Sequence, residues 1–150
     1  MEKPELQKLS LHNLTAVLGL QVRPEQRNFV ASNRESLCDL FLGTIRGRWV
    51  RAFALCVGKR PVGFVLLQYD GNAYELWRLM IGREFQGRGY GKGAMEQILS
   101  YLQALPAGPA DVCRLSYEPE NRRARALYHG FGFRETGERD QGEIVAIRKL

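Results

Sequence analysis

A glycine-rich turn separates a predicted strand from the longest predicted helix of this 150-residue chain. The segment Gln86-Gly87-Arg88-Gly89-Tyr90-Gly91-Lys92 follows a β-rich run at 74–81 and leads into a helical pattern over 89–105. Glycine allows a sharp turn and a close ligand approach. The first N–H groups of a helix lack internal partners, and the helix dipole makes that end partly positive. The turn therefore predicts a pyrophosphate site, to which Arg88 and Lys92 add formal charge.

A glycine-rich helix start is also compatible with a plain structural role. The segment has neither the G-x-G-x-x-G spacing of dinucleotide folds nor the G-K-[ST] ending of a P-loop. Its place after a strand, its two added basic residues and a second matching segment downstream favour the anion-binding interpretation.

Hydrophobic periodicity predicts strands and helices in alternation around this turn. Strands are expected at 6–11, 49–57, 62–68, 74–81, 112–117, 133–138 and 143–148. Helices are expected at 14–20, from about 33 to 43, at 89–105 and at 122–130. The order β-α-α-β-β-β-α-β-α-β-β predicts one α/β (α+β) domain over residues 1–150. Its mixed, mostly antiparallel central sheet of six or seven strands would be flanked by helices.

Local signals support these helices. Asn13 and Asn121 suit N-cap positions, and Ser32 with Glu35 has capping-box spacing. Gly130 suits the stop of the last helix. In the second helix, Leu37, Leu40 and Phe41 are expected to lie on one face.

The composition excludes several classes of protein. Three cysteines, Cys38, Cys56 and Cys113, are widely spaced, and His12 and His129 lie far apart, so neither a disulfide framework nor a metal site is expected. The cysteines are expected to be buried apolar residues rather than nucleophiles. No apolar run approaches the roughly 20 residues of a membrane helix, and the N-terminus lacks a signal-peptide pattern. We expect a cytoplasmic protein without a membrane partner.

The net charge of +6 indicates affinity for a polyanion. Both nucleic acid and the phosphates of a cofactor fit that charge. The sequence shows no helix-turn-helix, no RNP-like aromatic strand and no base-reading basic helix, so no nucleic-acid partner is expected.

Two motifs carry a family resemblance. Gln86-x-x-Gly89-x-Gly91 resembles the Q/R-x-x-G-x-G/A acetyl-CoA loop of the GNAT N-acetyltransferase superfamily. Residues 121–133 resemble that family's N-x-x-A-x-x-L-Y-x-x-x-G-F segment. The predicted order of elements is also the family's, over essentially the whole chain.

Shorter matches are similar to bacterial spermine/spermidine acetyltransferases. They are Trp77-Arg78-Leu79-Met80-Ile81, the turn at 86–92, Glu25-Gln26 and Phe29-Val30-Ala31-Ser32-Asn33. The resemblance implies acetyl transfer from acetyl-CoA to a primary amine of a small molecule, a polyamine first, directly within a ternary complex. An aminoglycoside, an amino acid or a protein N-terminus is the alternative acceptor. A non-catalytic acetyl-CoA sensor is a further alternative. The resemblance also allows a homodimer.

The resemblance further implies how acetyl-CoA is held. Backbone groups of Leu79 and Ile81 would bind the pantetheine arm, and the N–H of Met80 would polarise the thioester. Asn121 would bind the arm, serve as a plain N-cap, or do both. The residues expected at the cofactor are Leu79, Met80, Ile81, Gln86, Gly87, Arg88, Gly89, Tyr90, Gly91, Lys92, Asn121, Ala124 and Tyr128. For Arg122, Arg123 and Arg125, contact with the adenosine phosphates and exposure to solvent both remain open.

Two residues are candidates for the chemistry. An alkylammonium has a pKa near 10, so it must lose a proton before the nitrogen can attack. Glu75 is the candidate base, because strand alternation would place it on one face with Trp77, Leu79 and Ile81. A solvent-exposed Glu75 and a water chain are the alternatives. Tyr128, at the family's tyrosine position, is the candidate acid for the thiolate, or else a packed core residue.

A polyamine needs a locally acidic channel with apolar walls, since the net charge of +6 does not attract a cation. Position Trp77 is not acidic, although some polyamine acetyltransferases carry glutamate there. The residues expected to contact the acceptor are Glu25, Phe29, Glu35, Asp39, Tyr69, Glu75 and Trp77.

Overall fold

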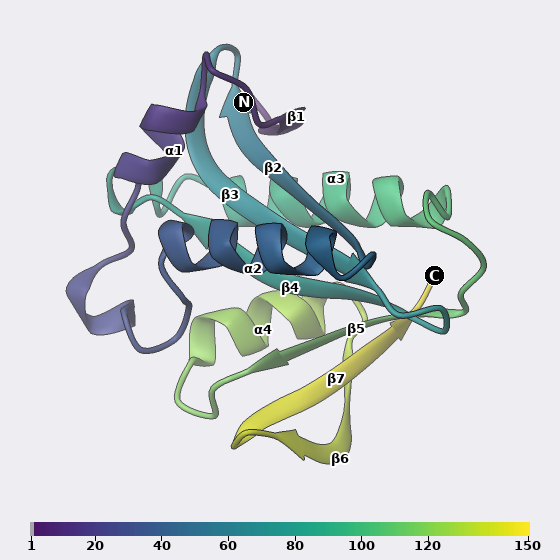
Figure 1. The fold of residues 1–150 in the computed structure, drawn as a ribbon. Coiled ribbons are helices and arrows are strands. Elements are labelled where there is room, and N and C mark those ends of the chain that lie inside the picture. The colour runs from purple at the N-terminus through teal and green to yellow at the C-terminus, as the bar shows by residue number, and fades with distance from the viewer. Residues whose placement is uncertain (1) are drawn as a thin grey trace.

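The computed structural model describes residues 2–150, which form a seven-stranded sheet with helices on both faces (Figure 1). The strands are β1 (Glu5–Lys8), β2 (Trp49–Val57), β3 (Arg60–Tyr69), β4 (Tyr74–Ile81), β5 (Val112–Tyr117), β6 (Arg134–Asp140) and β7 (Glu143–Lys149). The helices are α1 (Leu14–Gly19), α2 (Asn33–Ile45), α3 (Tyr90–Gln103) and α4 (Arg122–Gly130). Short 3₁₀ turns lie at Pro24–Gln26 and Arg83–Phe85. The predicted fold class and order of elements are confirmed.

The strand order is β1-β2-β3-β4-β5-β7-β6, and every neighbouring pair is antiparallel except β4 and β5. The two parallel strands are joined through α3, which crosses one face of the sheet, as a parallel connection requires. Within residues 2–150, neighbouring strands therefore run in the same direction at a single place, between β4 and β5.

Two hydrophobic layers fill the space between the sheet and its helices. One layer combines sheet residues such as Val65 and Leu67 with Met95 and Ile98 of α3 and Tyr128 of α4. The other combines the opposite sheet face with α1 and α2, through residues such as Phe64 and Val17. The alternation of buried side chains along β3 serves both layers, because successive residues of a strand point to opposite faces.

Strands β4 and β5 pair only over a short stretch. Their register joins Tyr74 to Cys113 and Glu75 to Arg114 and continues no further. Beyond Glu75, β4 stays paired with β3, while β5 stays paired with β7 up to Tyr117. The two strands therefore diverge, and their facing edges lie open in the middle of the sheet.

The turn before α3 adopts the backbone geometry that its glycines permit. Gly87 has φ of 79° and Gly89, the N-cap residue of α3, has φ of 81°. These angles lie in the left-handed region, where a Cβ atom costs about 1–2 kcal/mol. Both glycines are therefore required by the shape of the turn.

Several local predictions about the helices are wrong. The Asn13 side chain does not cap α1, because it accepts from the N–H of Ser10 at 2.9 Å and donates to the carbonyl of Lys8 at 2.9 Å. These two hydrogen bonds form a turn directly after β1, and the strand therefore ends at Lys8 rather than at the predicted residue 11. On α2, Leu37 and Leu40 pack in the layer against the sheet, whereas Phe41, on the same helix, is 66% exposed.

Helix α4 ends at Gly130 as predicted, but the left-handed glycine lies beyond that residue. Gly130 is the last helical residue and has no positive φ, whereas Gly132 has φ of 89°. The residue in the left-handed conformation after the helix is therefore Gly132 rather than Gly130. The caps at Ser32 and Asn121 are confirmed, since each side chain accepts a backbone N–H, from Glu35 and Ala124 respectively.

Of the three cysteines, Cys56 and Cys113 are buried as predicted, but Cys38 is exposed on α2. Within residues 2–150, no three His, Cys, Asp or Glu side chains gather closely enough to hold a metal ion. Across the same residues, no helix has the length and hydropathy to cross a bilayer.

Candidate active site

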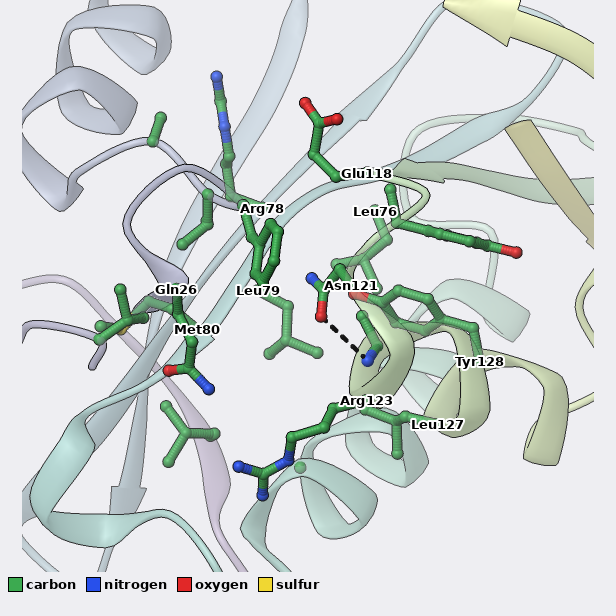
Figure 2. A pocket seen from close by; sticks show the side chains of 18 of the residues that line it. Gln26, Leu76, Arg78, Leu79, Met80, Glu118, Asn121, Arg123, Leu127 and Tyr128 are labelled. Atoms are coloured by element: carbon green, nitrogen blue, oxygen red, sulfur yellow. Dashed lines mark hydrogen bonds between the residues drawn. The ribbon is translucent and has the colours of Figure 1, made fainter. Parts of the chain in front are cut away.

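A cavity of about 890 Å³ occupies the opening between β4 and β5. Its walls come from β4, the glycine-rich turn, the first turns of α3 and α4, the end of β5 and the β6–β7 hairpin. A further wall comes from the chain between α1 and α2, which contributes Gln26 opposite Asn121 and Tyr128 (Figure 2). Residues from distant parts of the sequence thus meet around the diverging strands.

Strand β4 carries a bulge at the centre of this cavity. Leu66 of β3 faces Arg78, while the next residue, Leu67, faces Leu76, so Trp77 is an extra residue on β4. A bulge breaks the simple alternation of side chains. The predicted common face of Glu75, Trp77, Leu79 and Ile81 is therefore wrong.

The side chains after the bulge divide between the two faces. Trp77 and Met80 pack in the layer under α1 and α2, whereas Leu79 and Ile81 pack in the layer under α3. The β4 edge that faces β5 has no strand partner beyond Glu75. An unpaired strand edge offers backbone N–H and C=O groups to an extended ligand. The predicted binding of an arm along Leu79 and Ile81 is compatible with this edge.

The phosphate end of the cavity lies where the glycine-rich turn meets α3 and α4. Its lining includes the N-terminal residues Gly89 to Lys92 of α3, and Arg123 at the start of α4. Free N–H groups, a helix dipole and two cationic side chains are features that bind a diphosphate. The residues present therefore fit the phosphates of coenzyme A.

All the predicted cofactor residues except Arg88 line this cavity. Arg88 instead lies over the ring of Phe85, 5.8 Å from its centroid, and donates to the carbonyl of Glu84 at 3.2 Å. Among the arginines left open above, Arg123 lines the cavity, whereas Arg125 pairs with Glu135 at 2.8 Å.

Asn121 stands at the start of α4 with its amide at the cavity. Its Oδ1 accepts from the backbone N–H of Ala124 at 3.3 Å (Figure 2). The cap role is confirmed, and contact with the pantetheine arm stays a prediction. Because Oδ1 is used by the cap, the amide nitrogen remains as the group for a ligand.

Tyr128 reaches from α4 into the cavity. Its ring is 9% exposed and packs between Tyr117 and Phe133, at centroid distances of 5.9 and 6.0 Å. Figure 2 shows the side chain pointing toward Asn121 and Leu79. Burial raises the pKa of its phenol above the ordinary value. The hydroxyl therefore keeps its proton at neutral pH and is suited to be a donor.

Glu75 lies at the last paired residue before the strands diverge. Gln68 on β3 donates to its Oε2 at 2.6 Å. Burial raises the pKa of the Glu75 carboxyl, although the Gln68 bond and the charge of Arg114 act in the opposite direction. A carboxylate with a raised pKa inside a cavity has the properties of a general base.

Only part of the predicted acceptor set comes together. Phe29, Asp39, Glu75 and Trp77 line the cavity, whereas Glu25, Glu35 and Tyr69 do not. The Oδ2 of Asp39 lies 3.2 Å from Nη1 of Arg78, so its charge is paired, although the geometry is not that of a hydrogen bond.

Tyr69 lies outside this cavity and contacts the loop before β5. Its hydroxyl donates to the carbonyl of Pro109 at 2.8 Å. Its ring lines a second cavity, which also contains Trp49 and Arg114 and reaches Glu75 from the other side. Glu25 is exposed on the 3₁₀ turn, and Glu35 is exposed in the first turn of α2.

A second acidic group at the cavity was not predicted. Glu118 follows β5, Asp140 ends β6 and Glu143 begins β7, and all three line the cavity. Ser116 donates to Glu143 Oε1 at 3.3 Å, and burial followed by the charge of Glu118 raises the pKa of Glu143. No local pattern marks these residues, because only the β5–β7 pairing brings them beside β4.

The comparisons with known proteins agree with this geometry. Residues 14–133 match the family described as "Acetyltransferase (GNAT) family". The match covers most of the chain, and the chain belongs to this family. It is an N-acetyltransferase of the GNAT type, whose co-substrate is acetyl-CoA.

Individual relatives share only a minor part of their sequence with this chain. The chain is 28% identical to the spermine/spermidine N(1)-acetyltransferase of Bacillus subtilis (strain 168), over 92% of this chain and 93% of that protein. A spermidine N-acetyltransferase from Vibrio cholerae, solved with CoA and spermine, has a TM-score of 0.71 at 21% identity, covering 98% and 94% of the two chains. An aminoglycoside acetyltransferase solved with coenzyme A has a TM-score of 0.76 at 14% identity, covering 97% and 94%. The two structures share the fold of this chain.

Proposed function

We propose that this protein acetylates a primary amine of a polyamine such as spermine or spermidine. The observation that carries the proposal is a group of three carboxylates that line the cavity and have no salt-bridge partner within residues 2–150, Glu75, Glu118 and Glu143. In Figure 2, Glu118 lies at the opposite side of the cavity from Arg123. Arg78, which Figure 2 draws near Glu118, is paired with Asp39, so the three carboxylates still leave an excess of negative charge for a cationic acceptor, despite the net charge of +6.

The chemistry follows from the residues at the centre. Glu75, directly or through water, takes a proton from the bound ammonium and leaves a neutral amine. The amine nitrogen forms a bond to the thioester carbonyl carbon. The carbonyl oxygen receives a hydrogen bond from the N–H of Leu79 on the open edge of β4, because the backbone of Met80 faces β3 and the predicted role of its N–H does not fit. When the carbon–sulfur bond breaks, the thiolate takes a proton from Tyr128, and the second proton lost by the amine nitrogen restores the phenol. The products are an amide and a free thiol, with the proton of the ammonium released to solvent.

The bacterial relatives support this acceptor class, since the Bacillus subtilis protein is named for spermine and spermidine. An aminoglycoside is the second candidate, because solved relatives of equal similarity hold ribostamycin or kanamycin beside the coenzyme. Both acceptor classes are polycations, and the same acidic group serves either. They differ in shape, since a polyamine is a flexible chain with apolar methylenes and an aminoglycoside is a rigid ring system.

Turnover of acetyl-CoA against spermine, spermidine, kanamycin and a peptide with a free N-terminus tests the proposal. We expect kcat/KM for spermine or spermidine to exceed that for the other acceptors by at least about 10-fold, the usual discrimination of a shaped pocket. Higher kcat/KM with kanamycin would transfer the assignment to aminoglycosides. Binding of CoA without turnover of any amine would instead indicate a sensor.

A further inference from the structure

The chain between α1 and α2, residues 22–31, forms one wall of the cavity, and we call it the strap. Gln26, Phe29 and Val30 of the strap line the cavity, and Phe29 is one of the residues expected to contact the acceptor. The strap is fixed near both ends. Before it, Arg83 donates its N–H to the carbonyl of Gln21 at 2.8 Å, and after it, Asn33 donates its side chain to the carbonyl of Val17 at 2.8 Å.

A third tie fixes the middle of the strap to the phosphate turn. The side-chain nitrogen of Gln86 donates to the carbonyl of Ile81 and to Oε1 of Gln26, both at 2.9 Å. The orientation of this amide is determined, because a backbone carbonyl such as that of Ile81 accepts and never donates. The same Oε1 of Gln26 also accepts from the N–H of Arg23 at 3.1 Å. One oxygen of Gln26 therefore joins the strap to the first residue of the phosphate motif.

The tie depends strongly on Gln26. Among residues 2–150, the Oε1 of Gln86 is buried without a hydrogen-bond partner, which is unfavourable in a folded protein. The two bonds from the amide nitrogen offset that cost, and one of them goes to Gln26. Without Gln26, the Gln86 amide keeps one bond and the same unsatisfied oxygen.

We propose that Gln26 is a positioning residue that links acetyl-CoA binding at the phosphate turn to the acceptor wall of the cavity. A diphosphate held at the turn restrains Gln86, and the shared bond then restrains the strap with Phe29 and Val30. Two sites that both favour one arrangement of a linking segment bind their ligands cooperatively. The inference rests on the use of acetyl-CoA, and it is independent of which amine is the acceptor.

Hydrogen–deuterium exchange of the full chain with and without CoA tests the link. In the unaltered protein, saturating CoA is expected to slow amide exchange at 86–93 and also in the strap, the latter by at least about 5-fold, a typical coupling between sites. In Gln26→Met, which keeps the length of the side chain but removes the acceptor oxygen, exchange at 86–93 still slows while the strap no longer responds.

Two matched variants sharpen the result. Gln26→Glu retains oxygens that accept from Arg23 and Gln86, so the response of the strap is expected to return. Gln103→Met makes the same change as Gln26→Met at an exposed position near the end of α3, outside the cavity lining, and the strap should respond as in the unaltered protein.

The outcomes separate the two proposals. Protection at 86–93 with an unresponsive strap in the unaltered protein, or an equal response of the strap in Gln26→Met, would overturn the link and leave the acetyltransferase function intact. Absence of CoA protection everywhere would overturn acetyl-CoA binding and the link together.

Discussion

The two ends of the cavity are built in different ways. The phosphate end consists of one continuous turn and the first residues of two helices, where the groups offered to a phosphate are mainly backbone N–H groups. The acceptor end uses single side chains from β4, the loop after β5, the β6–β7 hairpin, α2 and the strap. A site made of backbone depends on local conformation, whereas a site made of side chains depends on which elements the fold brings together.

Between these ends stands Tyr128, and its removal should have the largest effect. Tyr128→Phe keeps the packing against Tyr117 and Phe133 but removes the proton donor. We expect kcat to fall by about 10²–10³, within the usual contribution of a general acid, while calorimetry shows unchanged CoA affinity. Tyr101→Phe on α3, outside the cavity lining, is the control and should keep full turnover. Equal kcat in the two variants would mean that Tyr128 is a packed core residue.

Glu75 should give the next largest effect. Glu75→Gln is expected to lower kcat/KM at neutral pH by about 10², because the amine then loses its internal base. Burial raises the pKa of Glu75, so the carboxylate takes up a proton at a higher pH than an exposed glutamate, and activity should fall as the pH decreases through that pKa. This acid limb of the pH–rate profile should vanish in Glu75→Gln.

Glu138→Gln on the exposed strand β6 is the matched control and should leave the profile unchanged. An acid limb that persists in Glu75→Gln would assign the base to another group or to water.

A substitution at the acceptor end should have a smaller effect on activity, and it should change the KM for the acceptor but not the KM for acetyl-CoA. Glu143→Gln removes one charge of the unpaired acidic group, and we expect the KM for spermine to rise by about 5–10-fold, since a partly exposed charge pair contributes roughly 1 kcal/mol. The KM for acetyl-CoA should stay the same. The control is Glu120→Gln, at an exposed position outside the cavity lining, and it should leave the KM of both substrates unchanged. A change in the KM for acetyl-CoA instead would show that the two ends are not separate.

A substitution that alters the backbone of the phosphate turn should have the smallest effect of the four. Gly89→Ala forces a Cβ atom into the left-handed region at φ of 81°, which costs about 1–2 kcal/mol. Thermal denaturation should show that loss of stability, and calorimetry should show weaker CoA binding with an unchanged KM for the acceptor. Gly130→Ala, with ordinary φ and open space around it, should be neutral or slightly stabilising. Unchanged thermal stability and CoA affinity in Gly89→Ala would contradict the claim that the backbone conformation of the turn forms the phosphate site.

Much of the fold was predictable from periodicity and caps. The run from β2 to β4, the helix α3 and the cap at Asn121 follow from local patterns, and the structure reproduces them within a few residues. The bulge at Trp77 was not predictable, because the alternation on either side of it looks continuous in the sequence. The exposure of Phe41 was also not predictable, since the periodicity of α2 alone does not tell which part of its apolar stripe the sheet covers.

The sequence by itself determined the phosphate turn, since positive φ at Gly87 and Gly89 and the start of α3 are properties of neighbouring residues. It also determined the order of strands and helices, because hydrophobic periodicity acts over a few residues. Only the tertiary structure decided which carboxylates face the opening between β4 and β5, and that Gln26 meets Gln86 across 60 positions of the chain. The physical reason is that a contact between distant side chains depends on strand pairing and helix packing, which no local pattern encodes.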